Sequence, residues 1–314
     1  MRRIRAKTVV ACACACAISA TPIYAAFSTR PGWGSTPYGA GGTGVTFRVW
    51  APNATNVTVK GQFNGNSNTA NPLFSEGTNG VWSVDVTNAV VGHAYKYFIN
   101  GTLNKQDPRG RSEVSSTGNT YIYNTTNFNW SGDTFVSTNV PLNDAVIYEL
   151  NIGTFNDTGS GPGTFVTATN RLPYLKQLGI TAVEVMPINE FPGDYSWGYN
   201  PSDMFGVESA FGGPDGFKKF VKACHSFGIA VLVDVVHNHY GQPIWTCGGL
   251  MDRTRAHTAG SISTNSPASA ARGGEIPDPT TPVSRSATSS KILSGCGWMS
   301  ITWTVSDGIR PTSC

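Results

Sequence analysis

Short runs in which hydrophobic and polar residues alternate recur between Val45 and Tyr123. The runs read VTFRVWAP, NVTVKGQF, VWSVDV and AYKYFING, and clusters of Asn, Gly and Pro separate them. A period of two is typical of strands that bury one face, and short strands with regularly spaced turns are typical of a small antiparallel β-sandwich. We therefore predict a sandwich over residues 45–125, preceded by a Gly/Pro/Ser-rich linker over residues 26–44.

The pattern changes after Val140. Three apolar runs, VIYELNIGTF, TAVEVMPI and IAVLVDVV, are separated by two stretches with helical spacing, TFVTATNRLPYLKQLG and DGFKKFVKACHSFG. Strand and helix in alternation predict parallel βαβ units. Because the runs are apolar on both faces, we expect strands that are buried on both sides.

Beyond Gln242 the pattern dissolves. Ser, Thr, Ala, Pro and Arg dominate residues 260–291, with no period of 2 or 3.6. This composition predicts an aberrant, disordered tail over residues 242–314.

The first 25 residues have the composition of a secretory signal peptide. A positively charged start is followed by an apolar run from Thr8 to Ala20 and a small-residue site near Ala25. The run is too short to span a bilayer. We expect a secreted or periplasmic protein with no membrane association beyond export. A lipoprotein signal ending at Cys12 is the alternative.

Charge excludes one class of partner. The net charge of the 314 residues is +3, and the four cations of the first seven residues account for it. No basic stripe remains that would indicate nucleic-acid binding.

Polar residues close the third predicted strand. The segment DVVHNH, Asp234 to His239, places a carboxylate, an amide and two imidazoles where a (β/α)8 barrel has its active site. The alternatives are that His237 and His239 are ordinary loop histidines or that they are two ligands of a metal site. A catalytic zinc ion needs three protein ligands, and a third is hard to name here.

An aromatic loop follows the second predicted strand. Residues Phe191–Gly206 read FPGDYSWGYNPSDMFG. Flat aromatic faces can stack on a pyranose ring, whereas Asn and Asp can bind its hydroxyls. The alternative is a loop that packs its own aromatic rings under the barrel rim.

These segments, in this order and spacing, resemble glycoside hydrolase family 13, the α-amylase family. The preceding sandwich, with FRVWAP, GVWSVDV, YKYFING and the DPRGR motif at Asp107–Arg111, resembles a family 48 carbohydrate-binding module. One position departs from that module, because Asn66 follows FNG where the module has a tryptophan. A structural docking role is therefore an alternative to glycan binding.

The resemblance implies a fold and a site. The fold is α/β: an immunoglobulin-like β-sandwich followed by the first three strands of a TIM (β/α)8 barrel, over residues 140–241. Tyr199 would stack on the sugar in the cleavage subsite, His239 would hydrogen-bond its hydroxyls, and Asp234 would orient the catalytic centre. Asn238 corresponds to a calcium ligand in many α-amylases. No other cofactor is implied, and the partner is an α-glucan such as starch, glycogen or maltooligosaccharides.

The catalytic carboxylates are missing from this pattern. Retaining hydrolysis needs a nucleophile and an acid/base roughly 5 Å apart. In the family these come from the ends of the fourth and fifth strands. The later acidic residues, Asp252, Glu275, Asp278 and Asp307, stand in the patternless tail. We therefore expect no catalytic residue in the chain as written, and no activity.

The genetic code suggests why. Read one frame over, the codons of Trp245-Thr246, Trp298-Met299 and Trp303-Thr304 must each contain an Asp codon. Residues Glu275–Thr281 permit Asn-Thr-Arg-Pro-Asp-Tyr, and residues Cys296–Arg310 permit a segment with Asp-Gly-Leu-Arg-Trp-Asp. The last Asp of that segment is similar to the family nucleophile. We interpret the tail as the product of a one-base deletion near Gly241 or Gln242, in the gene or its sequencing.

The resemblance leaves several activities open. The leading one is an α-glucan hydrolase or transglycosylase similar to 1,4-α-glucan branching enzyme. A secreted α-amylase and a maltooligosyl-trehalose trehalohydrolase are alternatives within the family. A non-catalytic glycan-binding protein is the alternative outside enzymes.

Overall fold

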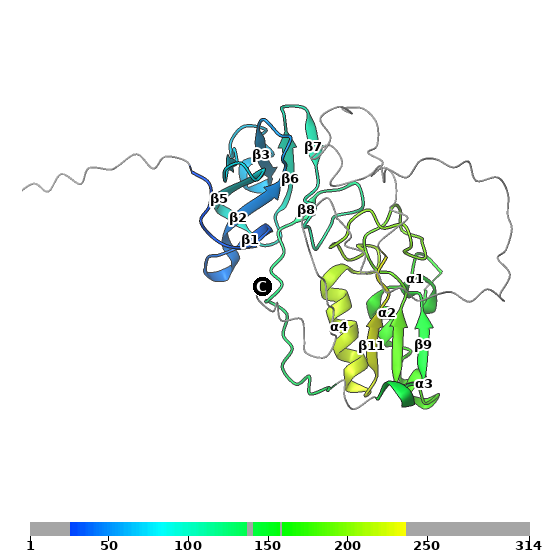
Figure 1. The fold of residues 1–314 in the computed structure, drawn as a ribbon. Coiled ribbons are helices and arrows are strands. Elements are labelled where there is room, and N and C mark those ends of the chain that lie inside the picture. The colour runs from blue at the N-terminus through cyan, green and yellow to red at the C-terminus, as the bar shows by residue number, and fades with distance from the viewer. Residues whose placement is uncertain (1–25, 137–140, 158, 237–314) are drawn as a thin grey trace, which may run out of the picture.

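The computed structural model describes residues 26–136, 141–157 and 159–236 of the chain (Figure 1). They form a β-sheet module, residues 26–125, and a parallel-sheet region, residues 141–236. The predicted signal peptide, 1–25, and the predicted tail, 242–314, lie outside these ranges. No described helix combines the length and apolar character needed to cross a bilayer.

The module consists of two antiparallel sheets. The first has the strand order β1-β2-β5-β4, and the second has the order β3-β6-β7 with β8 paired to β6. Their bounds are β1 Gly34–Pro37, β2 Thr43–Trp50, β3 Val57–Gly61, β4 Phe74–Ser75, β5 Val81–Val90, β6 Ala94–Ile99, β7 Leu103–Lys105 and β8 Thr120–Tyr121. Two single 3-10 turns, Ala40–Gly42 and Gln62–Asn64, lie between the early strands.

Alternate residues of both sheets fill one shared core. Phe47 of β2 and Tyr95 of β6 are completely buried, and their rings meet edge to face with centroids 4.9 Å apart. Val45 and Val49, two residues to either side of Phe47, are buried with it. This period of two is the pattern that the sequence predicted for residues 45–125.

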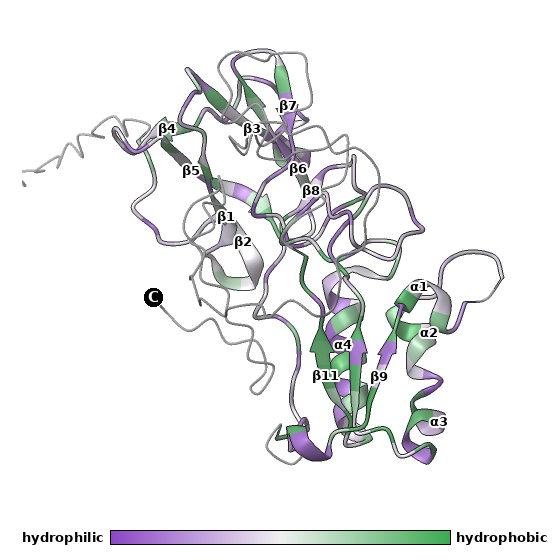
Figure 2. Cartoon of the chain, turned by 45° about the vertical axis from the view of Figure 1, so that its right-hand side comes forward, coloured by the Kyte–Doolittle hydropathy of each residue, from purple (hydrophilic) through white to green (hydrophobic). Residues whose placement is uncertain are grey.

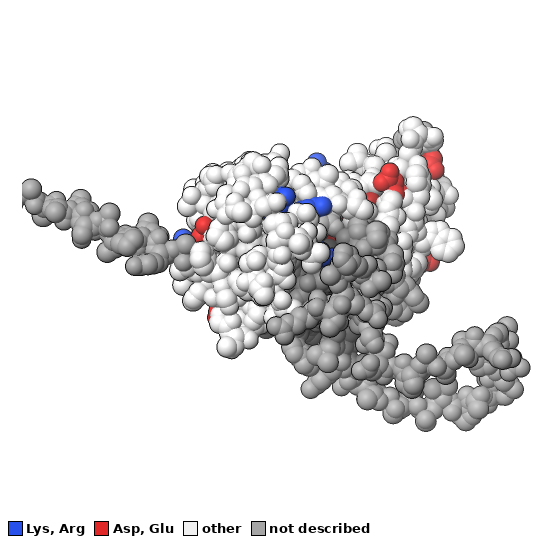
Figure 3. All heavy atoms as spheres, turned by 90° about the horizontal axis from the view of Figure 1, so that it is seen from above, with Lys and Arg blue, Asp and Glu red and all other residues white. Residues whose placement is uncertain are grey.

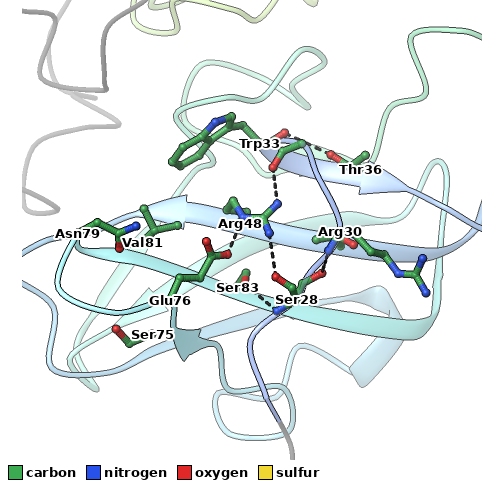
Figure 4. A network of polar contacts seen from close by, with 12 residues as sticks. Ser28, Arg30, Trp33, Thr36, Arg48, Ser75, Glu76, Asn79, Val81 and Ser83 are labelled. Atoms are coloured by element: carbon green, nitrogen blue, oxygen red, sulfur yellow. Dashed lines mark hydrogen bonds and ion pairs between the residues drawn. The ribbon is translucent and has the colours of Figure 1, made fainter. Parts of the chain in front are cut away.

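The predicted linker, 26–44, is in part a piece of the module. β1 pairs with β2, with Ser35 opposite Phe47. The buried Arg48 clamps the preceding residues: its guanidinium donates to Glu76, to the Gly32 carbonyl at 2.6 Å and to the Ser28 carbonyl at 3.0 Å (Figure 4). The linker prediction was wrong here because Gly and Pro occupy a short edge strand, where both are tolerated.

The parallel-sheet region has the strand order β11-β10-β9. Its strands are β9 Ile147–Leu150, β10 Ala182–Val185 and β11 Ala230–Val233, and its helices are α1 Ile152–Phe155, α2 Phe165–Thr169, α3 Leu172–Gln177 and α4 Gly213–Ser226. A 3-10 turn, Leu142–Asp144, precedes β9. The predicted parallel βαβ order is confirmed.

Two elements are shorter than predicted. The run VIYELNIGTF becomes β9 followed by helix α1, so only its first half is a strand. The stretch that ends at Gly179 becomes α2 and α3, which meet at Asn170 and Arg171. Thr164 caps α2 by accepting from the Thr167 backbone N–H. The Thr167 side chain accepts in turn from the Thr164 backbone N–H, so that the two residues form a capping box.

Within the described residues, the parallel sheet is covered on one face only. Leu150, Val183, Val185 and Val231 are buried against α2, α3 and α4. The other face, here called the bare face, carries Ile147, Glu149, Glu184 and Leu232. Ile147 is 42% exposed and Leu232 is 39% exposed. The expectation that the strands are buried on both sides was therefore wrong for the described residues. Figure 2 shows the largely hydrophobic strands beside α4, whose polar residues lie in stripes.

A segment we call the strap, residues 123–135, follows α4 in register from its first turn to its last. Tyr123 donates to Asp215 at 2.6 Å, and Lys222 donates to the Asn129 and Ser131 carbonyls. At the end, Asp133 bonds His225 Nδ1 at 2.7 Å. Figure 1 shows the strap descending from β8 beside α4. It therefore joins the module to the parallel-sheet region over the whole length of the helix.

Candidate active site

The site lies at the carboxyl ends of β10 and β11. The Tyr199 hydroxyl donates to Asp234 Oδ2 at 2.8 Å. Asp234 directly follows β11 and is held there by its backbone N–H, which donates to the Val185 carbonyl at 2.9 Å. The sequence singled out both residues, and the structure brings together two side chains that are 35 positions apart.

The hydrogen bond changes the acidity of the phenol. It raises the pKa of Tyr199 to about 12, first because Asp234 accepts a hydrogen bond from the phenol and so favours its neutral form. Partial burial and the nearby negative charges of Asp234, Glu149 and Glu184 raise the pKa further. Tyr199 therefore stays neutral over the physiological range. The residue is 38% exposed, which leaves part of its surface available for a ligand.

Two buried glutamates hold the long loop that carries Tyr199. Glu190 accepts from the backbone N–H of Ser209 at 2.7 Å and from its hydroxyl at 3.1 Å. Glu208 accepts from the backbone N–H groups of Phe191 and Ala210. These side chains tie the start of the loop to its end: Glu190, at the start, accepts from Ser209 at the end, and Glu208, at the end, accepts from Phe191 at the start.

Burial raises the pKa of both carboxyls, to about 7 for Glu190 and about 8 for Glu208. Desolvation is the larger cause in each case, and for Glu208 the negative charge of Glu190 adds to it. Part of this brace is thus protonated at neutral pH. Sequence reasoning did not single out these glutamates, although a polar residue at each end of an aromatic loop was visible.

The tip of the loop is fixed by short-range contacts. Ser196 donates to the Asn200 side chain, and Asn151 donates to the Ser196 carbonyl at 3.3 Å. Gly198 has a positive φ of 88°, and an added Cβ would lie 2.0 Å from the Pro187 carbonyl oxygen. Only glycine fits there. The turn exposes two aromatic neighbours, Tyr195 at 71% and Trp197 at 72%.

The remaining predicted site residues cannot be placed. His239, which was expected to contact the sugar, and Asn238, the predicted calcium ligand, lie outside the described residues, as does His237. Within the described ranges no three His, Cys, Asp or Glu side chains form a group that could hold a metal ion.

The bare face of the sheet carries two further carboxylates. Glu149 of β9 lies directly beside Glu184 of β10 in the parallel register. Both precede the ends of their strands, and Asp234 lies further along β11 on the same face. The pair of glutamates therefore lies beside the site on the bare face, one residue before the carboxyl ends of the two strands.

Buried acids also join the site loop to the module. Asp203 of the loop and Glu113 of the module are both at least 97% buried by relative surface area. Burial raises the pKa of each carboxyl well above its usual value; next in effect are the charge of Asp203 on Glu113 and the charge of Glu190 on Asp203. Beside them, the Arg109 guanidinium lies over the rings of Phe205, at 5.0 Å, and Trp33, at 5.5 Å. The module thus supports the loop that presents Tyr199.

Two family models match the chain. The model of the alpha amylase catalytic domain matches residues 147–248, and the model of carbohydrate-binding module 48, the isoamylase N-terminal domain, matches residues 33–114. The first match spans β9 to β11 with the loop of Tyr199. The second spans strands β1 to β7 of the module and ends at Val114, before β8.

Curated relatives match both parts together. The malto-oligosyltrehalose trehalohydrolase of Saccharolobus solfataricus is 37% identical over 198 residues, which are 63% of this chain and 33% of the relative. The 1,4-alpha-glucan branching enzyme GlgB of Rhodospirillum rubrum is 35% identical over 218 residues, 64% of this chain and 29% of the relative. The chain thus spans about a third of the length of these relatives.

A solved structure has the same arrangement of elements. The crystal structure of a Salmonella typhimurium protein assigned as an alpha amylase superimposes with a TM-score of 0.60 at 30% identity. The superposition covers 68% of this chain and 34% of that one.

Proposed function

Because the chain belongs to the α-amylase family of glycoside hydrolases and carries a family 48 carbohydrate-binding module, we propose that its parent enzyme acts on α-1,4-glucans. By parent enzyme we mean the product of the same gene with the reading frame continued past residue 241. The observation that carries the proposal is the Tyr199–Asp234 pair at the carboxyl ends of β10 and β11. Active sites of this fold lie at those strand ends.

In the parent enzyme, the exposed face of Tyr199 would stack on the glucose unit next to the scissile bond. Asp234, by accepting a hydrogen bond from the phenol, would hold the Tyr199 ring in place and orient the hydroxyls of the bound glucose. His239 would donate to the same glucose. This is binding and positioning chemistry, and bond cleavage requires a nucleophilic carboxylate and a carboxylic acid roughly 5 Å from it.

Those two carboxyls would come from strands that follow β11. We propose that five more strands close the parallel sheet into an eight-stranded barrel and bury the bare face, and that the module is an immunoglobulin-like sandwich. The support is the exposure of two apolar side chains, Ile147 and Leu232, on the bare face. A parallel sheet is normally covered on both sides.

We further propose that a one-base deletion near codon 241 removes these strands, so that the chain as written does not turn over glucans. Resequencing through codon 242 tests the deletion: clean DNA that encodes the printed tail would end the idea. Turnover of glycogen by the printed chain and by a frame-restored version tests the enzyme. We expect activity in the restored version only.

The bond formed by the parent enzyme is a finer proposal. Identity to the branching enzyme and to the trehalohydrolase is similar, at 35% and 37%. We favour transfer to a 6-hydroxyl, as in a branching enzyme. Analysis of restored-enzyme products from amylose decides it: new α-1,6 linkages support branching, short linear chains indicate an α-amylase, and release of trehalose from maltooligosyl-trehalose indicates the third activity.

A non-catalytic glycan-binding protein is the second candidate, and the exposure of Tyr195 and Trp197 favours it. Such a protein would bind glucan with no turnover in either frame. We also propose export, from the signal-like residues 1–25, and a neutral polysaccharide partner rather than nucleic acid. Figure 3 shows a face with few charged side chains, the acidic ones gathered toward the side of the parallel-sheet region.

A further inference from the structure

The module and the loop that carries Tyr199 meet at a contact that the function proposed above does not use. We call it the module–loop contact. It consists of residues 109–114 of the module, between β7 and β8, and residues 203–208 at the end of the loop. Val207 pairs with Ser112 there in a short parallel bridge. A change at this contact therefore reaches the loop of the candidate site.

Acidic side chains from both sides converge on the module–loop contact. Three of them surround Gly206: a Cβ added there would lie 3.2 Å from Glu113 Cγ and 3.4 Å from the Cβ atoms of Asp203 and Glu190. These three acids are each at least 97% buried. A fourth, Asp107 of the module, is completely buried, and its charge acts on both Glu113 and Asp203. Like charges in such a dry place repel strongly, so full ionisation of the group is unfavourable.

The surroundings of Glu113 and Asp203 suit neutral carboxyls. Among the described residues, Glu113 Oε1 and Asp203 Oδ2 have no hydrogen-bond donor. Glu113 Oε1 lies against Gly110, where an added Cβ would be 2.0 Å from it, and Oε2 accepts from Gln106 Nε2 at 3.3 Å. A buried carboxylate oxygen without a donor is costly, whereas a protonated carboxyl carries no charge and can itself donate.

The charges of the neighbouring acids act in the same direction. Burial is the largest cause of the raised pKa of Glu113, and the charge of Asp203 comes next. Burial also raises the pKa of Asp203, followed by the charges of Glu190 and Asp107. Each carboxyl thus favours the neutral form of the other.

Positive and hydrogen-bonding groups near the contact oppose this effect in part. The Thr120 hydroxyl lowers the pKa of Glu113, and Lys96 of β6 feels the charge of Glu113. The Lys96 ammonium donates to a backbone carbonyl at 3.2 Å in a solvent-exposed place. The Arg109 guanidinium acts on Asp107, which also accepts from two tyrosines. Burial outweighs these groups, because the pKa of Glu113 stays raised.

We propose that Glu113 and Asp203 form a proton-operated latch between the module and the site loop. While both carboxyls are neutral, the module–loop contact is closed and the module holds the loop of Tyr199. When both release their protons to solvent, two like charges face each other in a dry place, and the contact opens so that water can solvate them. The inference rests on the proposed function for its consequence: the parent enzyme would lose glucan positioning by Tyr199 as the pH rises.

Hydrogen exchange of the full chain, measured by mass spectrometry at several pH values and corrected for the intrinsic pH dependence of exchange, tests the latch. The readout is exchange in residues 109–114, because the hydrogen bonds of Glu190 and Glu208 lie within the loop. Opening releases protons, so its equilibrium constant rises by up to about tenfold per group for each pH unit between the usual and the raised pKa. We expect exchange in residues 109–114 to rise about tenfold between pH 5 and 8, with β2 and β5 unchanged.

Two variants separate the latch from the other acids of the loop. Glu113→Gln with Asp203→Asn removes both ionisable groups and keeps their shapes, so exchange should rise by less than about twofold over the same pH range. The matched control is Glu208→Gln, which removes a buried acid of the same loop that braces it internally. The control should keep the tenfold rise. Thermal melts show whether each variant is folded.

Four results would overturn the inference. They are pH-independent exchange in residues 109–114 of the unsubstituted chain, an equal rise in β2 and β5, a rise that persists in the double variant, and a rise abolished by Glu208→Gln alone. The first two need no variant, so they decide the matter even if the double variant does not fold. None of them bears on glucan turnover by the frame-restored enzyme, so failure of the latch and failure of the proposed function are distinguishable.

Discussion

The module and the parallel-sheet region bury their apolar side chains in different ways. The module folds two antiparallel sheets onto one core, so that Phe47 and Tyr95 are completely buried by residues of the same 100-residue stretch. The parallel sheet covers one face with its own helices and leaves Ile147 and Leu232 exposed on the other. Antiparallel strands meet their partners within a few residues, whereas a parallel barrel needs all its strands before any interior exists.

The difference shows which region can fold without later parts of the chain. The described part of the module includes every strand that its core uses, so we expect it to be stable by itself. The parallel sheet ends at β9 and β11 with unpaired edges in the described residues, and such edges promote association with other chains. The candidate site follows the same division: the described residues contain the Tyr199–Asp234 pair, but only three strands of the parallel sheet.

The largest contrast should come from matched truncations in the two regions. Phe47→Ala removes a fully buried ring and should lower the free energy of unfolding by about 3–5 kcal/mol. Leu232→Ala removes a side chain from the bare face and should change it by less than about 0.5 kcal/mol. Chemical denaturation of both variants measures this. Equal losses would mean that the bare face is covered in solution.

Stability should also depend on pH through the buried acids of the site loop. The pKa of Glu190 is raised to about 7 and that of Glu208 to about 8, so the folded state holds their protons when the unfolded state has released them. Their contribution to the free energy of unfolding is fully present below about pH 4.5 and is lost as the pH rises through 7 and 8. Between pH 5 and 9 we expect a loss of about 2.5 kcal/mol from Glu190 and about 4 kcal/mol from Glu208.

Thermal melts across this range measure the dependence, and Glu190→Gln should flatten it. The module alone, residues 26–125, serves as the control because it lacks both glutamates. A chain that becomes more stable between pH 5 and 8 would contradict the assignment of protonated carboxyls to this loop.

A smaller effect is expected where the strap ends. His225→Ala removes the partner of Asp133 and the ring that stacks on Phe135 with centroids 4.3 Å apart. We expect a loss of about 1–2 kcal/mol, because Asp133 Oδ2 loses its partner in a largely buried place, whereas Oδ1 keeps the backbone N–H of Phe135. Hydrogen exchange should increase in residues 131–136 and stay unchanged in β2 and β5. Increased exchange in the module strands would show that the two regions unfold together.

The smallest effect concerns the bare face itself. Glu149 and Glu184 are neighbours across the parallel strands, and like charges in that position are unfavourable. Glu149→Gln should stabilise the chain by about 0.5 kcal/mol at low ionic strength and by less at high salt. Denaturation at two salt concentrations measures it. Destabilisation would indicate a cation bound between the two carboxylates.

Sequence reasoning predicted what depends on local pattern. The alternation around Phe47 gave the module strands, and the apolar runs gave β9, β10 and β11 in their correct order. Tyr199 and Asp234 were identified through their motifs, and the structure joins them by a hydrogen bond. Whether the strands are buried on both faces depends on which other parts of the chain pack against them, so no local pattern could answer it.

Other features were invisible because they depend on distant partners. The pairing of β1 with β2 turned part of the predicted linker into a strand, although Gly34 and Pro37 alone suggest a turn. The brace of Glu190 and Glu208 and the burial of Glu113 and Asp203 near each other each arise from tertiary burial of residue types that usually face water. Similarly, the strap could not be read from its Asn- and Thr-rich sequence.

Glucan turnover by two proteins tests the central claim most directly. The printed chain and the frame-restored enzyme would be purified side by side and assayed on the same glycogen, with release or transfer of glucose chains as the readout. We predict turnover by the restored enzyme and none by the printed chain, because positioning by Tyr199 and Asp234 does not break a bond without the two later carboxyls. Turnover by the printed chain, or none by either protein, would contradict it.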